Sequence, residues 1–428
     1  MMLFRISFLV LFGVLLAIPS AALELKAIQA DLHGFLDARY GRRLQNDPYQ
    51  DAKSLGETRL QLELSRMGDR STLLLKTDVY YDDVVDQNKV DLEEGTGWLD
   101  LREANLLFSP HVMADVKLGR QILTWGTGDL LFINDLFPKD WQAFFSGRDV
   151  DYLKAPSDAI MISIFPEWAN IDLVYTPRFD ADRFISGERI SYWDPVSQSL
   201  AGANAVTRTD RPDDWFGDDE WSVRISRNMA GYELALYGYD GFWKSPAGYD
   251  IAAGRATFPK LRVFGASLRG NLAKGIASLE SGYYDSRDDR DGKDPMVPNS
   301  EWRALAGYEQ EVVRNVTAGV QYYLEAMQDY DRYRAGLLTT ATARDEVRQV
   351  LTLRLTWQLL NQNLTLSAFS YWSPTDHDGY LRPLVEYKIT DAWQISAGAN
   401  LFWGKEDYTF FGQFENNSNL YAGLRHSF

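Results

Sequence analysis

The sequence predicts an all-β protein, a closed antiparallel transmembrane β-barrel of about eighteen strands. Three observations support this prediction. Apolar and polar residues alternate over segments of about ten residues, the length that a tilted strand needs to cross a membrane. Short turns alternate with long polar loops. The chain also ends on an alternating segment, as expected if the last strand pairs with the first.

The N-terminal segment has the layout of a secretory signal peptide. Arg5 precedes an apolar stretch from Ile6 to Ile18, and small residues follow at positions 20–22. A membrane-anchoring helix is the alternative, but the stretch is shorter than the ~20 apolar residues that a helical span requires. We expect residues 1–22 to be removed and residues 23–428 to form the barrel.

The composition excludes several kinds of site. Cysteine is absent, so disulfides and cysteine-ligated metals are excluded. The formal net charge of −16 argues against nucleic acid as a partner, because phosphate binding requires a basic surface. The four histidines are too scattered to suggest a metal site. The acidic stretch 285–294 could bind Ca²⁺ but fits a solvated loop better. We expect no cofactor, no metal and no catalytic residue.

The clearest hairpin lies between Arg59 and Asp82. Leu60, Leu62 and Leu64 alternate with polar residues, a tight turn follows at 67–70, and the alternation then resumes. The same unit recurs along the chain, with short turns expected near Pro110 and Glu167 and at 228–231, 270–274, 313–315, 361–363 and 390–392.

Counting these hairpins, with a first strand near 32–40 and a last at 420–428, gives eighteen strands, an even number as such barrels require. Alternation is weak near Ala104 and Phe264, which leaves sixteen or twenty strands open. A soluble β-sandwich or propeller is the alternative fold.

Aromatic residues recur at one end of alternate strands. If the first strand runs outward, each of the nine outward strands ends in aromatic side chains. Such rings gather at a membrane interface because one part is apolar and another can bond to water. We therefore expect a girdle formed by Tyr40, Tyr80, Tyr81, Trp125, Tyr175, Tyr237, Tyr239, Tyr283, Tyr284, Tyr322, Tyr323, Tyr371, Trp372, Phe402 and Trp403.

The last strand carries a further signal. Leu420, Leu424 and Phe428 lie on its apolar face, and Phe428 is the final residue. This ending resembles that of Gram-negative outer-membrane porins, whose last residue is typically Phe. The resemblance implies an outer-membrane location and recognition of Leu424 and Phe428 by the barrel-assembly machinery. It also implies the lipid bilayer and small solutes as partners, and a possible homo-oligomer.

The most distinctive stretch is VKLGRQILTWGTGDLLFINDLFPKDW. Its Gly119-Arg120-Gln121 and Trp125-Gly126 resemble the G-R-Q…W-G segment of a group of Gram-negative outer-membrane barrels and, more distantly, the alginate-export type. Arg120 falls on the apolar side of its strand, where an arginine facing lipid costs ~2–4 kcal/mol. We expect a β-bulge at Gly119 to turn Arg120 into the lumen. The alternative is that Arg120 lies near an interface and snorkels.

The loop that follows, residues 127–158, is long and unusually apolar. Such a loop is unlikely to extend into water, so we expect it to fold into the barrel and constrict the pore, as in porins that the chain resembles. Packing over the barrel mouth or against a neighbouring subunit is the alternative. The residues expected to form the constriction are Asp129, Phe132, Phe137, Trp141, Phe144, Phe145 and Arg148.

Alternation also assigns charged residues to the wet face of the wall. The pore-lining set comprises Arg59, Glu63, Lys76, Asp78, Arg102, Lys117, Arg120, Arg224, Arg303, Arg348, Arg354, Arg382 and Glu386. The same face should carry Arg262, Lys388, Arg425, Asp100, Asp172, Glu233, Glu280 and Glu325. Leaving Arg120 aside, positive residues exceed negative ones in this set. We therefore expect a weak anion preference or none, despite the acidic chain.

These features favour a porin-like channel for passive passage of small polar or charged solutes. A structural or export sleeve around a partner complex or polysaccharide is the alternative. An outer-membrane enzyme is a weaker one, because no nucleophile and base occur at a fixed spacing.

Overall fold

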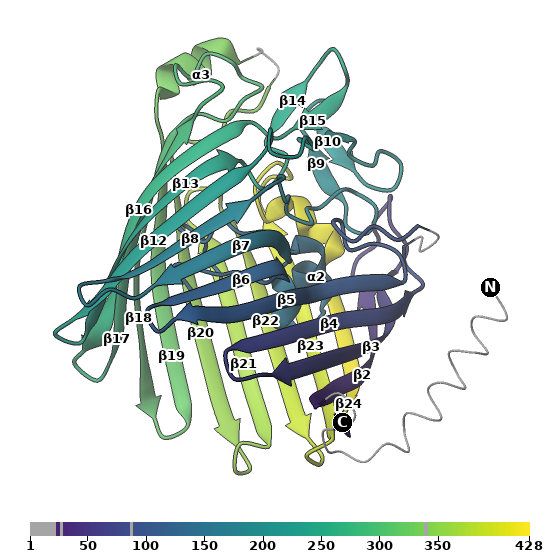
Figure 1. Cartoon of the computed structure of the whole chain (residues 1–428). Coiled ribbons are helices and arrows are strands. Elements are labelled where there is room, and N and C mark those ends of the chain that lie inside the picture. Colours follow the sequence, from purple (N-terminus) through teal and green to yellow (C-terminus); the bar gives the residue numbers. More distant parts are fainter. Residues whose placement is uncertain (1–22, 26–28, 86–88, 338–340) are drawn as a thin grey trace.

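A closed barrel of eighteen antiparallel strands forms the body of the computed structural model, which describes residues 23–25, 29–85, 89–337 and 341–428 (Figure 1). The expected signal peptide, residues 1–22, lies outside the described residues. The wall strands are β2 (Ala30–Arg43), β3 (Lys53–Met67), β4 (Ser71–Asp82), β5 (Leu99–His111), β6 (Ala114–Gln121), β7 (Ser157–Ile164), β8 (Asn170–Thr176), β12 (Glu220–Met229), β13 (Tyr232–Phe242), β16 (Lys260–Leu272), β17 (Gly275–Ser286), β18 (Glu301–Val313), β19 (Val316–Met327), β20 (Val347–Leu359), β21 (Leu364–Ser373), β22 (Asp378–Lys388), β23 (Trp393–Gly404) and β24 (Asn419–Ser427).

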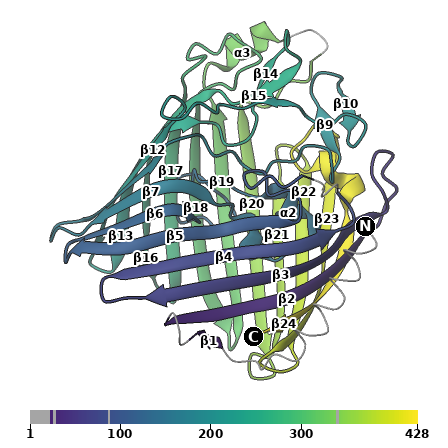
Figure 2. The same cartoon turned by 45° about the vertical axis from the view of Figure 1, so that its right-hand side comes forward.

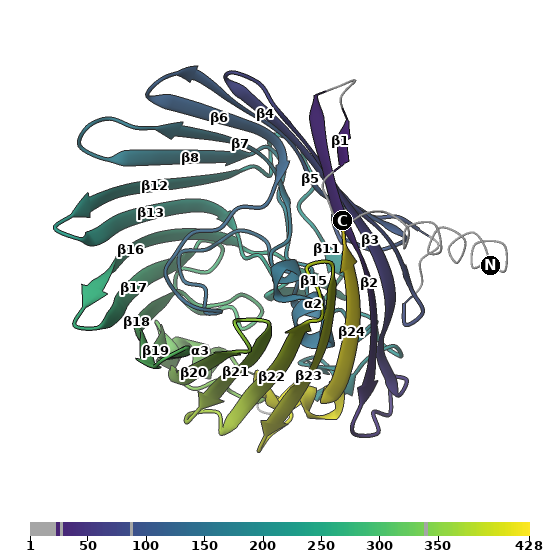
Figure 3. The ribbon, with the colours of Figure 1, turned by 90° about the horizontal axis from the view of Figure 1, so that it is seen from below.

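The predicted closure is confirmed by the pairing of the last wall strand with the first. β24 pairs antiparallel with β2, from Phe35 opposite Ser427 to Arg43 opposite Asn419. Figure 3 shows the resulting ring, with the segments of the chain running round it in order. Closure leaves no free edge in the wall, so every strand has two neighbours. The short β1 (Leu23–Leu25) adds only a local pairing to the start of β2.

The two ends of the barrel differ, as the turn pattern predicts. Tight turns join the strands at one end, and long connections join them at the other (Figures 1 and 2). We call these the turn end and the loop end. The long connections contain α2 (Trp141–Ser146), η1 (Val150–Leu153), β9 (Tyr192–Asp194), β10 (Ser199–Ala201), β11 (Thr209–Asp210), β14 (Gly248–Asp250), β15 (Arg255–Thr257), α3 (Tyr330–Gly336) and η2 (Gly412–Asn417). In the part of the chain that the structure describes, no helix has the length and apolar character needed to cross a membrane.

One irregularity explains the weak alternation near Ala104. Lys76 of β4 lies opposite Glu103 of β5, but the next residue, Thr77, lies opposite Leu101. The extra residue, Arg102, is a β-bulge, and it shifts the inward–outward pattern of β5 by one position. A two-residue period cannot be followed through such a shift.

The aromatic residues at the loop end of the wall divide between its two faces. Half-exposed rings on the outer face, such as Tyr40, Trp372 and Trp403, agree with a girdle. The girdle prediction is wrong for the buried rings that face the lumen, namely Tyr80, Tyr237, Tyr239, Tyr284, Tyr323, Tyr371 and Phe402. These rings face inward because the lumen at this height contains an apolar loop, and most of them pack against it.

Candidate functional site

The connection between β6 and β7, residues 122–156, enters the barrel. We call it the inserted loop. Figure 3 shows its helix α2 within the ring of strands. Phe144 and Phe145 of α2 are buried against Tyr380 of β22, and Phe145 also meets Phe402 of β23. Farther round the wall, Ile133 joins the same apolar cluster. The middle of the barrel therefore has a hydrophobic core, as in a water-soluble domain.

Glu280, on β17, anchors the first part of the inserted loop. Its Oε2 accepts hydrogen bonds from the backbone N–H and the hydroxyl of Thr127, at 2.7 and 3.0 Å, and from the N–H of Gly128 at 3.1 Å. Its Oε1 accepts two more from Asn134. The neighbouring Gly265 leaves the space for Asn134, because a Cβ there would lie 1.7 Å from the Asn134 amide oxygen. Five donors on one buried carboxylate fix this stretch of backbone.

Asp129, at the tip of this stretch, binds two further strands. Its backbone N–H donates to the side-chain oxygen of Gln321 on β19, and its carbonyl accepts from the Gln321 amide at 2.8 Å. Its carboxylate forms a two-point ion pair with Arg354 of β20. Asp129 and Arg354, assigned by sequence to the constriction and to the wall, thus lie together.

The second half of the inserted loop contacts the opposite wall through Tyr152. The guanidinium groups of Arg59 and Arg102 both lie close to the Tyr152 ring, at 4.5 and 4.9 Å from its centroid. Its hydroxyl donates to Asp78, which also pairs with Arg59. The sequence assigned Arg59, Asp78 and Arg102 to the wet face but gave no signal for Tyr152.

Arg148 connects the end of α2 to two separate strands of the wall. Its guanidinium pairs with Glu57 of β3 at 2.8 Å, and its carbonyl accepts from Arg382 of β22 at 3.0 Å. The adjacent Asp149 pairs with Arg425 of β24. Arg148 of the predicted constriction and Arg382 and Arg425 of the predicted wall therefore hold the inserted loop in place.

The remaining predicted wall residues lie away from these contacts. Toward the turn end, Lys76 pairs with Glu63 at 2.7 Å, and Lys117 approaches Glu103. Farther round, Arg224 pairs with Glu233 and Asp172. Arg303 and Arg348 lie toward the loop end, near Glu325 and Asp376 respectively. Glu386 lies near the turn end and accepts a hydrogen bond from Gln394. Phe137, from the constriction set, packs against Trp125.

The bulge expected at Gly119 is not formed. Arg120 stays in register, opposite Ala104 on one side and Asp158 on the other, so it shares the face of Leu118. Its guanidinium binds both oxygens of Asp158 and the carbonyl of Leu92 in the β4–β5 connection. Arg120 thus lies at the loop end of β6, where loop groups satisfy it, and it does not line the pore. Gly119 has φ +109°, and a Cβ there would meet the Ala104 carbonyl oxygen at 2.3 Å.

Arg262 also differs from the prediction, because it faces outward. Its neighbours Leu261 and Val263 are buried in the apolar cluster of the lumen, and Arg262 pairs instead with Asp240 on the outer surface. Apolar residues point inward on this strand because the inserted loop offers them an apolar partner. The rule that apolar side chains face lipid fails at this height.

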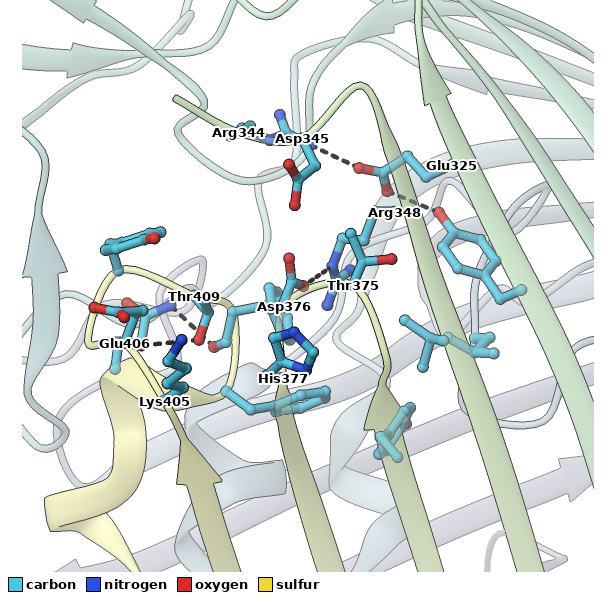
Figure 4. A pocket seen from close by; sticks show the side chains of 18 of the residues that line it. Glu325, Arg344, Asp345, Arg348, Thr375, Asp376, His377, Lys405, Glu406 and Thr409 are labelled. Atoms are coloured by element: carbon cyan, nitrogen blue, oxygen red, sulfur yellow. Dashed lines mark hydrogen bonds and ion pairs between the residues drawn. The ribbon is translucent and has the colours of Figure 1, made fainter. Parts of the chain in front are cut away.

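A cavity of about 650 Å³ opens on the loop-end side of the inserted loop (Figure 4). Its apolar side is formed by aromatic rings of the inserted loop and of the β23–β24 connection, including Phe132, Trp141 and Phe410. Its polar side carries four positive and four negative side chains, which are Arg303, Glu325, Arg344, Asp345, Arg348, Asp376, Lys405 and Glu406. Such a volume and mixed lining are typical of small-molecule sites.

A second group of charges surrounds Asp180, which lies buried in the β8–β12 connection. Asp180 accepts a hydrogen bond from the backbone N–H of Asp158, and its own carbonyl and N–H contact Lys244 and Glu220. Burial raises the pKa of Asp180 to about 6. The hydrogen bond from the Asp158 N–H and the charge of Lys244 act in the opposite direction, and the charges of Glu220 and Asp158 add a smaller rise.

The two residues expected to act in assembly occupy different environments. Phe428 pairs through its backbone with Gly34 of β2, and its ring is buried against Leu36 and Leu60 on the outer face. Leu424 lies on the same face and is 41% exposed. Their role in assembly stays a prediction.

Comparisons with known proteins agree with the fold. No family model matches the sequence, and no curated protein matches it either. Among solved structures, the chain is similar to OccAB3 of Acinetobacter baumannii (10% identity, 93% of this chain and 99% of that one, TM-score 0.56). It is also similar to OccD3 of Pseudomonas aeruginosa (11% identity, 96% and 93%, TM-score 0.53). At such identities the likeness shows the fold alone, and with the eighteen strands that fold is a closed antiparallel transmembrane β-barrel. The suggested link to the alginate-export type stays a prediction.

Proposed function

We propose that the protein is a porin-like channel through which small polar or charged solutes cross the outer membrane passively. The observation that carries this proposal is the charged lumen of an eighteen-stranded barrel, in which a loop from the chain itself narrows the passage. Barrels of 16–18 strands are wide enough for an aqueous channel. Ion pairs along the lumen, such as Lys76 with Glu63, offer solutes a hydrated path at the turn end.

We further propose that the inserted loop is the constriction. Its contacts run from Glu280 on one side to Arg59 and Arg102 on the other, so it spans the cross-section of the barrel. Because Phe144 and Phe145 fill the space beside β22 and β23, solutes must pass around the loop. This geometry supports a narrow, selective path rather than a wide pore.

The alternatives receive less support. A sleeve around a partner needs an empty lumen, whereas the inserted loop occupies the middle of this one. An enzyme needs a nucleophile held by a base, whereas the buried carboxylates and guanidinium groups described above bind one another or the loop backbone.

Single-channel recording in a planar bilayer tests both proposals. Gln121 and Ser157 lie opposite each other in register, so a short Gly/Ser turn of about four residues can replace residues 123–155 and join β6 to β7 directly. We expect the excised protein to conduct several-fold more than the full chain. A matched control shortens the tip of the β9–β10 hairpin, which lies outside the barrel wall.

Heat-modifiable migration on gels verifies that each variant is folded. A folded excision variant with unchanged conductance contradicts the constriction. Absence of conductance in both folded proteins, with no swelling of liposomes in sugar solutions, contradicts the channel itself.

A further inference from the structure

We propose that the cavity above the inserted loop binds a small aromatic zwitterion, a molecule with a ring, an ammonium group and a carboxylate. The proposal deepens the channel function, because such a site would collect a solute before the constriction. It concerns binding alone, however, and is measured without conduction.

The apolar side of the cavity calls for a ring. Phe410 is 44% exposed, and Tyr408 beside it is 42% exposed. Phe132 and Trp141 form an edge-to-face pair on the inserted loop, with centroids 6.0 Å apart. Aromatic surface left open inside a polar vestibule is characteristic of a ligand site. A planar ring can stack or meet these rings edge-on, which an aliphatic chain cannot.

The polar side calls for both charges. Three of its four cations already have carboxylate partners, since Arg348 pairs with Asp376 and both Arg303 and Arg344 approach Glu325. Because these ion pairs largely neutralise one another, they attract a ligand that carries a single charge only weakly.

Three charged side chains of the cavity remain without an ion-pair partner among the described residues, namely Lys405, Asp345 and Glu406. Figure 4 shows Asp345 on one side of the cavity, in the β19–β20 connection, and Lys405 with Glu406 on the other, at the end of β23. Lys405 suits a carboxylate, and the two acids suit an ammonium group. A singly charged aromatic would leave one sign unmatched, whereas a zwitterion satisfies both.

Calorimetric titration of the full barrel in detergent tests this assignment with four probes. Tryptophan has all three features, tryptamine lacks the carboxylate, indole-3-propionate lacks the ammonium group, and alanine lacks the ring. We expect tryptophan to bind at least about fivefold more tightly than each of the others, since each lost contact to a charged group or ring is worth roughly this factor or more.

Variants assign each contact. Lys405→Gln should weaken tryptophan and indole-3-propionate about tenfold and leave tryptamine unchanged, and Asp345→Asn should weaken tryptophan and tryptamine instead. Phe410→Ala should weaken all three ring compounds. The matched controls are Lys293→Gln and Phe216→Ala, which alter an exposed lysine and an exposed aromatic in other connections.

Equal affinity for the four probes, or no detectable binding of tryptophan, overturns the proposal. Tighter binding of indole-3-propionate than of tryptophan overturns it in favour of an anion site. Binding in the absence of conductance supports this site and counts against the channel, so the two failures are distinguishable.

Discussion

Asn134 of the inserted loop donates two hydrogen bonds to one oxygen of Glu280 on β17, from its backbone nitrogen at 2.8 Å and from its side-chain nitrogen at 3.0 Å. Both residues are buried, and 146 positions separate them in the sequence. The inserted loop is therefore fixed to the wall by a carboxylate on a strand that lies much later in the sequence.

Replacing Glu280 should loosen the inserted loop. Glu280→Gln keeps one acceptor oxygen but turns an amide toward N–H groups of Thr127 and Gly128, so buried donors lose their partner. We expect a loss of roughly 2–4 kcal/mol in the free energy of unfolding, measured by urea titration of the heat-modifiable form. Cleavage of the loop by added protease should also become faster.

Glu233→Gln is the matched control, since Glu233 is 40% exposed and pairs with Arg224 away from the loop. Equal stability and equal protease resistance of the two variants would show that Glu280 does not anchor the loop.

Ion selectivity should be weak. Relative to the sequence assignment, Arg262 lies outside the lumen. The lumen-facing charges that the assignment left out include more carboxylates than cations, among them Asp37, Glu57, Asp82, Glu103 and Glu301 against Arg39 and Arg43. The excess of positive wall residues is thereby removed. In a roughly tenfold KCl gradient, at salt that screens the loops, the reversal potential should lie near zero. A strongly cation-selective or anion-selective potential contradicts this expectation.

The ring of Phe428 should matter for assembly beyond its backbone. Phe428→Ala keeps the backbone pairing with Gly34 but removes a ring that covers Leu36 and Leu60. We expect a several-fold lower fraction of heat-modifiable protein in the outer membrane. Ile395→Ala, on the same outer face in β23, removes apolar area from a half-exposed position outside the predicted assembly signal and serves as the control. Equal amounts of the two folded variants would rule out a special role for the terminal ring.

Stability should depend on pH through Asp180. Its pKa is raised to about 6 by burial, against about 3.9 for an unfolded aspartate. A raised pKa in the folded state gives a stabilisation that is complete below pH 4 and is lost as the pH rises through 6.

Asp180→Asn removes this loss, since an amide oxygen still accepts from the N–H of Asp158. The variant should be more stable than the parent at pH 7.5, by up to about 3 kcal/mol, and equal to it at pH 4. Asp213→Asn, at an exposed position, should change neither value. A gain from Asp180→Asn that is the same at both pH values contradicts the assigned cause.

The fold was largely predictable because alternation and turn signals are local. The hairpin at 67–70 and the turn at 390–392 can be recognised from neighbouring residues alone, and turns of this kind along the chain set the strand number. Alternation says which side chains share a face, but it does not say what covers that face. Leu261 and Val263 are apolar and yet point inward, because a loop more than 100 residues earlier covers them.

The candidate site was predictable only in part for the same reason. The apolar composition of 127–158 indicated a loop that avoids water, and Arg59, Arg354 and Arg382 were assigned to the inner wall. Their actual partners, Tyr152, Asp129 and the Arg148 carbonyl, are distant in sequence, and no spacing rule connects them. Arg120 was misplaced because its partners, Asp158 and the Leu92 carbonyl, belong to other segments.

The inserted loop also constrains the order in which the chain can mature. The inserted loop is synthesised before β12, yet the ring of Phe145 packs against Phe402 of β23. The Phe145 carbonyl also accepts a hydrogen bond from the Asn419 side chain, 274 positions later in the sequence. Until β23 and β24 have been synthesised and paired, Phe144 and Phe145 expose hydrophobic surface to chaperones and proteases. A nascent chain interrupted after β19 would therefore be a substrate for degradation. The strands that seal the barrel therefore also supply the last partners of the inserted loop.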